Sequence, residues 1–150
     1  MIKKITKLMV LPLLLTTSLL ASSEAEVKAI VEKAVNLVKQ DCDQALKKIA
    51  EKNGEFHNGS LYVFGYDADV VMVVHPVKAH LVGRSYKGKP DVKGKKFRDE
   101  IVSKGLAGGG WTSYSYQKPK TKGIHAKKSY SSAVMCNDKK IILAAGMYAK

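Results

Sequence analysis

Apolar residues recur every three or four positions from Val27 to Ile49, which is the period of an amphipathic helix. The members of this stripe are Val27, Ile30, Val31, Ala34, Val38, Ala45, Leu46 and Ile49. Ser23 followed by Glu26 has the pattern of a capping box, which starts helices, and Asn53-Gly54 is typical of a helix end. The pattern therefore predicts one long helix over residues 24–54.

Beyond residue 55 the pattern changes to short β-branched and aromatic runs, which are typical of strands. Residues 61–66 and 70–75 form two such runs with a short acidic turn between them, so we predict a hairpin. A loop rich in Gly and Pro follows, then a short predicted helix over residues 97–106, which a run of three glycines ends. Three further strands are predicted over residues 111–116, 127–135 and 140–148.

This order of elements favours an α+β fold in which the long N-terminal helix packs on a five-stranded antiparallel sheet. The loop and the short helix of residues 77–106 would cover the other face of the sheet. A pocket would then lie between this cover and the sheet. The order of elements thus predicts a fold with room for a pocket on one face of the sheet.

Residues 1–23 have the pattern of a secretory signal peptide. Three lysines without an acid precede an apolar stretch over residues 8–20, and small residues follow it. This stretch is shorter than the roughly 20 residues that a membrane-spanning helix needs, so a retained membrane anchor is the weaker alternative. We therefore expect cleavage near residues 21–25 and one periplasmic or secreted domain over residues 24–150.

The chain has two cysteines, Cys42 and Cys136. Two cysteines in a small exported domain usually pair, because the compartment is oxidising. Cys42 lies on or beside the apolar stripe of the predicted helix, so it can face the sheet. We predict a Cys42–Cys136 disulfide, with two buried thiols as the alternative.

The formal net charge is +13, and the excess is concentrated in residues 56–150, which hold seventeen Lys or Arg and six acids. Such a field attracts anions and weakens as salt rises. An exported protein does not meet cytoplasmic nucleic acid, so we expect no nucleic-acid partner. Two alternatives stay open beside a small anionic ligand: a polyanion, or a membrane receptor or envelope complex to which the basic surface docks.

Patterns of catalytic and metal sites are lacking in the sequence. The four histidines have no metal-ligand spacing. The glycine-rich run at residues 105–111 precedes a predicted strand and lacks the Lys-Ser/Thr of a phosphate-binding loop, and no GxSxG motif occurs. We therefore predict no enzyme activity, no metal and no cofactor.

Several short motifs of residues 55–148 occur in a characteristic order and spacing. They are Leu61-Tyr62-Val63-Phe64, Tyr66-Asp67, His75-Pro76, Leu81-Val82-Gly83, Asp91 with Gly94 and Phe97, Gly108-Gly109-Gly110-Trp111, Tyr114, Pro119, Lys127 with Ser129-Tyr130, and Gly146-Met147-Tyr148. Together they resemble the second subtype of the single Cache domain, a PAS-like extracellular sensor module. The chain departs from that family at Val70, where a glycine is usual, and at Ala126, where a proline is common.

The resemblance implies a PAS-like sheet and a small monocarboxylate ligand, such as acetate, propionate, pyruvate or lactate. The sequence ends two residues after Tyr148. We therefore expect a stand-alone exported module that passes its signal to a membrane receptor or kinase.

The resemblance also implies a charge partner for the ligand. A buried carboxylate must be paired or richly hydrogen-bonded, and Lys127 matches the family's lysine before the serine–tyrosine pair. The alternative for Lys127 is a solvated lysine in a basic strand. Arg84 competes for the same role, because its guanidinium is a better fork for a carboxylate. His75, at a strand end, would donate a hydrogen bond to the acid or serve a structural role.

Aromatic side chains would form the wall around the ligand's apolar tail. Tyr114 and Tyr130 combine an apolar body with a polar tip, and Tyr62 and Phe64 share one face of their strand, although Phe64 fits core packing equally well. Trp111 and Tyr114 point to opposite faces of a regular strand. We therefore place Tyr114 in the pocket and keep Trp111 as core or lid.

Overall fold

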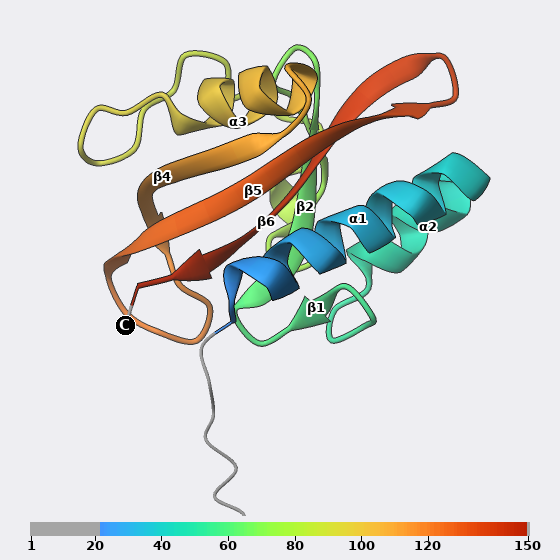
Figure 1. The fold of residues 1–150 in the computed structure, drawn as a ribbon. Coiled ribbons are helices and arrows are strands. Elements are labelled where there is room, and N and C mark those ends of the chain that lie inside the picture. Colours follow the sequence, from blue (N-terminus) through green and yellow to red (C-terminus); the bar gives the residue numbers. More distant parts are fainter. Residues whose placement is uncertain (1–21, 150) are drawn as a thin grey trace, which may run out of the picture.

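The computed structural model describes residues 22–149, in which three helices pack on a six-stranded antiparallel sheet (Figure 1). This is the α+β class that the sequence predicts. The predicted signal peptide lies almost wholly outside the described residues. No helix within residues 22–149 is long and apolar enough to cross a membrane.

Two helices, α1 (Glu24–Gln40) and α2 (Cys42–Ala50), replace the single helix predicted over residues 24–54. The chain leaves the helical conformation at Asp41, where φ is −158° and ψ is 105°. The Asp41 side chain accepts a hydrogen bond from the amide of Gln44 at 3.0 Å and so caps α2. An N-cap inside the apolar stripe therefore divides the predicted helix in two.

The capping box predicted at the start of the helix is present. The amide of Glu26 donates to the Ser23 hydroxyl at 3.2 Å, and the amide of Ser23 donates to the Glu26 carboxylate at 2.8 Å. Both bonds satisfy amides that have no partner within the helix.

The sheet has the order β1-β2-β6-β5-β4, and β3 also pairs with β2. Its strands are β1 (His57–Asn58), β2 (Leu61–Asp67), β3 (Met72–Val74), β4 (Gly110–Gln117), β5 (Ile124–Cys136) and β6 (Lys139–Tyr148). There are six strands rather than the five predicted, because the two residues of β1 pair with the start of β2. The long strands β5 and β6 form the centre of the sheet, with β2 and β4 beside them.

The predicted hairpin is formed by β2 and β3, with a turn that a valine completes. Val70 has φ 63°, in the left-handed region that favours glycine. The Asp67 carboxylate accepts hydrogen bonds from the amides of Asp69 and Val71, both at 2.9 Å. These bonds hold the turn although residue 70 is not a glycine.

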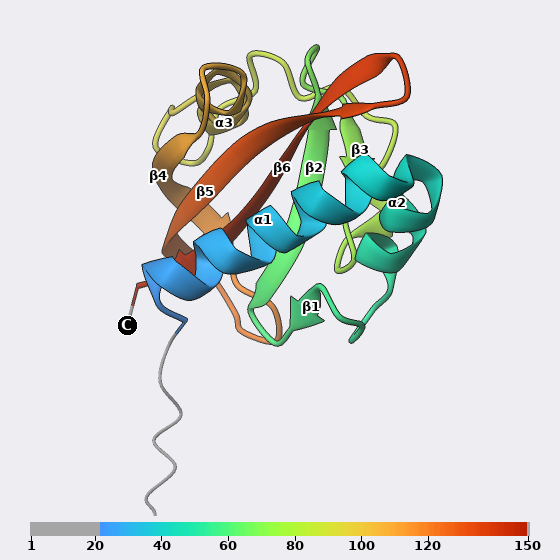
Figure 2. The ribbon, with the colours of Figure 1, turned by 45° about the vertical axis from the view of Figure 1, so that its right-hand side comes forward.

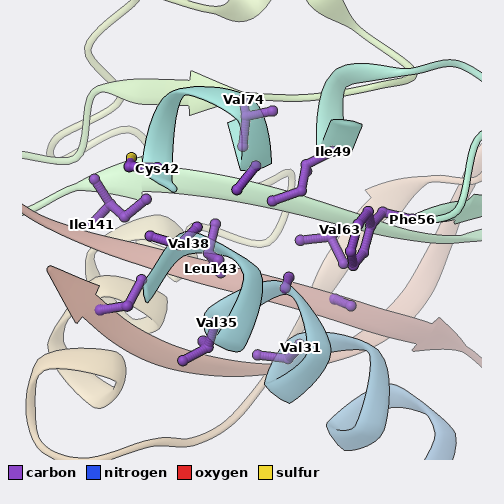
Figure 3. Packing of buried hydrophobic residues seen from close by; sticks show 14 of the residues in the cluster. Val31, Val35, Val38, Cys42, Ile49, Phe56, Val63, Val74, Ile141 and Leu143 are labelled. Carbon is purple, nitrogen blue, oxygen red and sulfur yellow. The ribbon is translucent and has the colours of Figure 1, made fainter. Parts of the chain in front are cut away.

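The two faces of the sheet carry different cores (Figure 2). On one face, α1 and α2 pack an aliphatic cluster, in which Val31, Val35 and Val38 of α1 meet Val63 and Leu143 of the sheet (Figure 3). On the other face, α3 (Phe97–Leu106) and the preceding loop cover an aromatic cluster. The aromatic face is the one that positions the candidate site.

A disulfide joins Cys42, at the start of α2, to Cys136, at the end of β5. The two Cα atoms are 5.2 Å apart, and 94 residues separate them in sequence. The predicted pairing is therefore present, on the face of the sheet that α1 and α2 cover.

Candidate ligand-binding site

A small cavity lies within the aromatic face of the sheet. Its lining comprises Tyr62, Phe64, Tyr66, His75, Phe97, Tyr114, Tyr116 and Lys127. Alternation along the strands explains the five residues from β2 and β4, because every second residue of each strand points to the same face. The cavity has a volume of about 10 Å³, close to the minimum for one water molecule.

Lys127 projects from β5 into this cavity and is only 3% exposed. Its ammonium nitrogen donates a hydrogen bond to the Tyr62 phenol at 3.0 Å. The same nitrogen lies 4.2 Å from the ring centroid of Tyr62, and 5.0 Å from the centroids of both Phe64 and Tyr148. Among the described residues, no carboxylate forms an ion pair with this ammonium. The cation is thus buried among aromatic faces, which stabilise it only in part.

Burial lowers the pKa of the Lys127 ammonium from 10.5 to about 7, and the positive charge of Lys78 contributes further. A buried cation without a counter-ion loses its hydration and gains little in return. The group therefore titrates near neutral pH, and an anion that enters the cavity would favour its protonated form.

His75 is also 3% exposed, and its position is fixed by the backbone that follows it. Its Nδ1 accepts hydrogen bonds from the amides of Val77 at 3.2 Å and Lys78 at 3.0 Å. Burial, and then the charge of Lys127, lowers the pKa of His75 to about 3, so the ring is neutral. Since Nδ1 accepts, the proton lies on Nε2, which makes Nε2–H a fixed donor.

Tyr114 forms part of the wall beneath α3. Its ring stacks on Phe97, with the centroids 4.2 Å apart and the planes 7° from parallel. Its hydroxyl shares a hydrogen bond of 2.8 Å with the Ser129 hydroxyl. The phenol is therefore already paired within the sheet, and the ring offers mainly apolar surface to the cavity.

The structure brings together five of the eight residues predicted for the site: Lys127, His75, Tyr114, Phe64 and Tyr62. Their predicted part in ligand binding becomes a proposal below.

The other three predicted residues, Trp111, Tyr130 and Arg84, are not part of the cavity. Trp111 and Tyr130 lie on the opposite face, with ring centroids 5.5 Å apart, and pack against the α1 cluster. Tyr130 is an odd number of residues from Lys127 along β5, so strand alternation turns it away. Arg84 is exposed, and its backbone carbonyl accepts a hydrogen bond from the amide of Met72 at 3.0 Å.

Three lining residues were missed by the sequence analysis: Tyr66, Tyr116 and Phe97. Tyr66 continues the alternation of Tyr62 and Phe64, and Tyr116 continues that of Tyr114. The two-residue period of the strands could therefore have identified both residues. Phe97 is the first residue of the predicted short helix, and its stacking on Tyr114 depends on how α3 lies over the sheet.

Within residues 22–149, no three His, Cys, Asp or Glu side chains lie close enough to hold a metal ion. The described cavity instead combines a buried ammonium, a neutral imidazole donor, phenol groups and apolar rings. This combination suits a small anion with a short apolar part.

Comparison with known proteins assigns the class. The family model of the Single Cache domain 2 matches residues 17–148, so the chain belongs to this family. Cache domains are extracellular or periplasmic, ligand-binding and non-catalytic sensor modules of chemoreceptors and kinases.

Solved structures share the fold. The periplasmic sensor domain of a chemotaxis protein superposes with a TM-score of 0.75 and 25% identity, over 85% of this chain and 95% of that one. A Cache chemosensory domain, described as showing the structural basis for carboxylic acid recognition, superposes with a TM-score of 0.73 and 23% identity, over 84% of this chain and 92% of that one.

One curated relative is a sensor histidine kinase, MctS of Rhizobium johnstonii. It is 36% identical over 69 residues, which is 46% of this chain. The match spans only 15% of the kinase's length. The chain is thus related to chemotaxis and histidine kinase sensors through its sensor domain.

Proposed function

We propose that this chain is a sensor module that binds a small monocarboxylate, of the acetate, propionate, pyruvate or lactate type, without transforming it. The observation that carries the proposal is the ammonium of Lys127, which is buried and has no carboxylate partner among the described residues. A charge in this position is costly unless a counter-ion joins it. We propose that the carboxylate of a ligand is the counter-ion that pairs with this ammonium.

The surrounding groups suit the rest of such a ligand. The Nε2–H of His75 and the hydroxyl of Tyr62 supply hydrogen-bond donors beside the ammonium, and a carboxylate accepts several such bonds. The rings of Phe64 and Phe97 supply apolar surface for a methyl or ethyl group. The cavity as it stands has room for about one water molecule, so the lining side chains must move apart to admit a ligand, which favours the shortest acids.

The likeness to known sensors supports the same proposal. The solved Cache domain described for carboxylic acid recognition has this fold, and the family senses solutes outside the cytoplasm. We further propose that residues 1–23 direct export and that a membrane receptor or kinase receives the signal.

Binding is tested by a thermal-shift and calorimetry screen of the four acids, each compared with its uncharged amide. An acid at about one hundred times its dissociation constant should add about 2.7 kcal/mol to the free energy of unfolding, while the amide should add little. Lys127→Met should abolish the shift. If no short acid shifts the wild-type transition, or if the variant responds equally, the proposal is wrong.

A further inference from the structure

A second hollow opens to the surface next to the Lys127 cavity, with a volume of about 370 Å³. It is lined by Tyr62, Val77, Lys78, Gln117, Lys118, Pro119, Lys120, Thr121 and Lys122. Four of these residues are lysines, and none is Asp or Glu. This hollow is therefore a concave surface with charge of one sign.

The positive charge of the hollow is not neutralised by the protein. Among the described residues, none of its four lysines takes part in an ion pair. The Lys78 ammonium donates to the side-chain carbonyl of Gln117 at 3.0 Å and lies 4.6 Å from the ring centroid of Tyr116. The Lys118 ammonium lies 5.9 Å from the centroid of Tyr148. Both lysines thus rest on neutral partners.

The hollow adjoins the buried site through shared side chains. Tyr62 lines both spaces, and its phenol holds the Lys127 ammonium. Tyr116 and Tyr148, which lie under Lys78 and Lys118, also face Lys127, with centroids 5.5 and 5.0 Å from its nitrogen. The side chain of Tyr62 is therefore part of the wall of both an outer space lined by four lysines and an inner space lined by one.

The turn between β4 and β5 places three lysines on the rim. Residues 118–123 alternate lysine with other residues, and the chain reverses where Lys120 has φ 58° and Gly123 has φ 82°. The turn lies near the C-terminal end of β6 (Figure 1), where the Tyr148 hydroxyl donates to the carbonyl of Gln117 at 2.9 Å. The basic run in the sequence thus becomes one wall of the hollow.

We propose that this hollow is the entrance through which an anionic ligand reaches Lys127, and that its lysines set the rate of association. This inference rests on the proposed function. A cleft lined by one sign of charge focuses the field and raises the local concentration of the opposite ion, which speeds association by about 10- to 1000-fold. The outer hollow is large enough for a whole short acid, which then displaces Tyr62 and the neighbouring rings as it enters the inner cavity.

The test compares Lys118→Gln/Lys120→Gln/Lys122→Gln with a control variant of equal charge change. The control replaces Lys47, Lys52 and Lys139 by glutamine. These three lysines are exposed, lie outside the hollow and form no ion pair with a described residue. NMR line-shape titration with the acid that binds the wild type gives the dissociation constant and the dissociation rate together. The association rate constant follows from their ratio.

At about 20 mM sodium chloride, the entrance variant should associate about tenfold more slowly than the wild type, with an unchanged dissociation rate. The control variant should stay near the wild type, and about 300 mM sodium chloride should remove the difference. An equal loss in both variants, or no loss in the entrance variant, overturns the entrance while leaving the binding site standing. Failure of the wild type to bind any acid overturns both proposals.

Discussion

The ammonium nitrogen of Lys127 lies 3.0 Å from the phenol oxygen of Tyr62, and both side chains are buried. The phenol is a neutral partner, because burial raises the pKa of Tyr62 far above its usual value. The charge of the pair is therefore that of the Lys127 ammonium alone, which titrates near neutral pH. This charge lowers the stability of the free protein, and it favours the binding of an anion that pairs with it.

Lys127→Met separates binding from folding. The change removes the charge and keeps much of the apolar stem, so we expect affinity for the acid to fall by at least about 100-fold. The free energy of unfolding at pH 7 should stay level or rise by about 1–4 kcal/mol, as when other buried charges are replaced by apolar groups. Calorimetry and urea unfolding measure the two effects. Lys139→Met, an exposed control, should change neither, and a marked loss of stability in Lys127→Met would show that the charge supports the fold.

The titration of Lys127 predicts that stability rises with pH. Its pKa is about 7 in the folded chain against an ordinary 10.5, so between these values the unfolded chain binds more protons, and the free energy of unfolding grows as pH increases. From pH 7 to 9 the gain should be about 2 kcal/mol, since each full pH unit contributes up to about 1.4 kcal/mol. Urea unfolding of the wild type should show this gain and Lys127→Met should lack it; equal slopes would contradict the assignment.

The same titration should weaken acid binding above pH 7, because the neutral amine no longer pairs with a carboxylate. Calorimetry at neutral pH in two buffers of different ionisation enthalpy should show that the protein takes up a proton on binding. Binding without proton uptake, and with constant affinity from pH 6 to 9, would contradict this prediction.

The fold and five residues of the candidate site could be predicted, because they follow from the spacing of side chains along helices and strands and from the order of elements and motifs in the sequence. Alternation in β2 and β4 places Tyr62, Phe64 and Tyr114 on one face, and the family's motif order includes Lys127. The break at Asp41 could not be predicted, since the apolar stripe continues on both sides of it. The choice of one short polar residue as a cap depends on how α2 meets the sheet.

Two of the residues that were predicted for the site but lie elsewhere show a second limit of prediction from the sequence. Tyr130 was chosen for its chemistry, although strand alternation from Lys127 turns it to the α1 face. Arg84 lies in a loop, where no period tells which way a side chain points. Contacts across elements, such as Phe97 on Tyr114, are set by tertiary packing and leave no local signal.

The two nitrogens of His75 have separable roles. His75→Asn keeps an acceptor near the Nδ1 position, so the turn at Val77 and Lys78 should persist, but the Nε2–H donor is lost. We expect affinity for the acid to fall about 10- to 100-fold, the value of one hydrogen bond to a charged group. His75→Gln keeps a donor and loses the acceptor, so it should reduce stability more than affinity. The reverse order in calorimetry and urea unfolding would contradict these roles.

The Cys42–Cys136 disulfide should stabilise the fold without touching the site, because it lies on the α1 and α2 face. Replacing both cysteines by alanine should lower the free energy of unfolding by about 2–5 kcal/mol, with unchanged affinity for the acid. Reduction of the wild type should give the same loss in urea unfolding. An oxidised protein no more stable than the reduced one would contradict this role.

Gly146 lies where β6 passes Ser129 of β5, directly against the stem of Lys127. A Cβ added there would lie 2.2 Å from the Ser129 hydroxyl oxygen and 2.7 Å from Cε of Lys127, closer than such atoms approach. Gly146→Ala should therefore push Lys127 from its place, reduce affinity for the acid and cost about 1–3 kcal/mol of stability.

Gly110→Ala is the matched control on the same sheet, because its Cβ would first meet the flexible Lys104 side chain at 3.4 Å. We expect this variant to keep its affinity and nearly all its stability. Should Gly146→Ala bind and unfold like the control, the close approach of β6 to Lys127 would not be what holds the ammonium in the cavity.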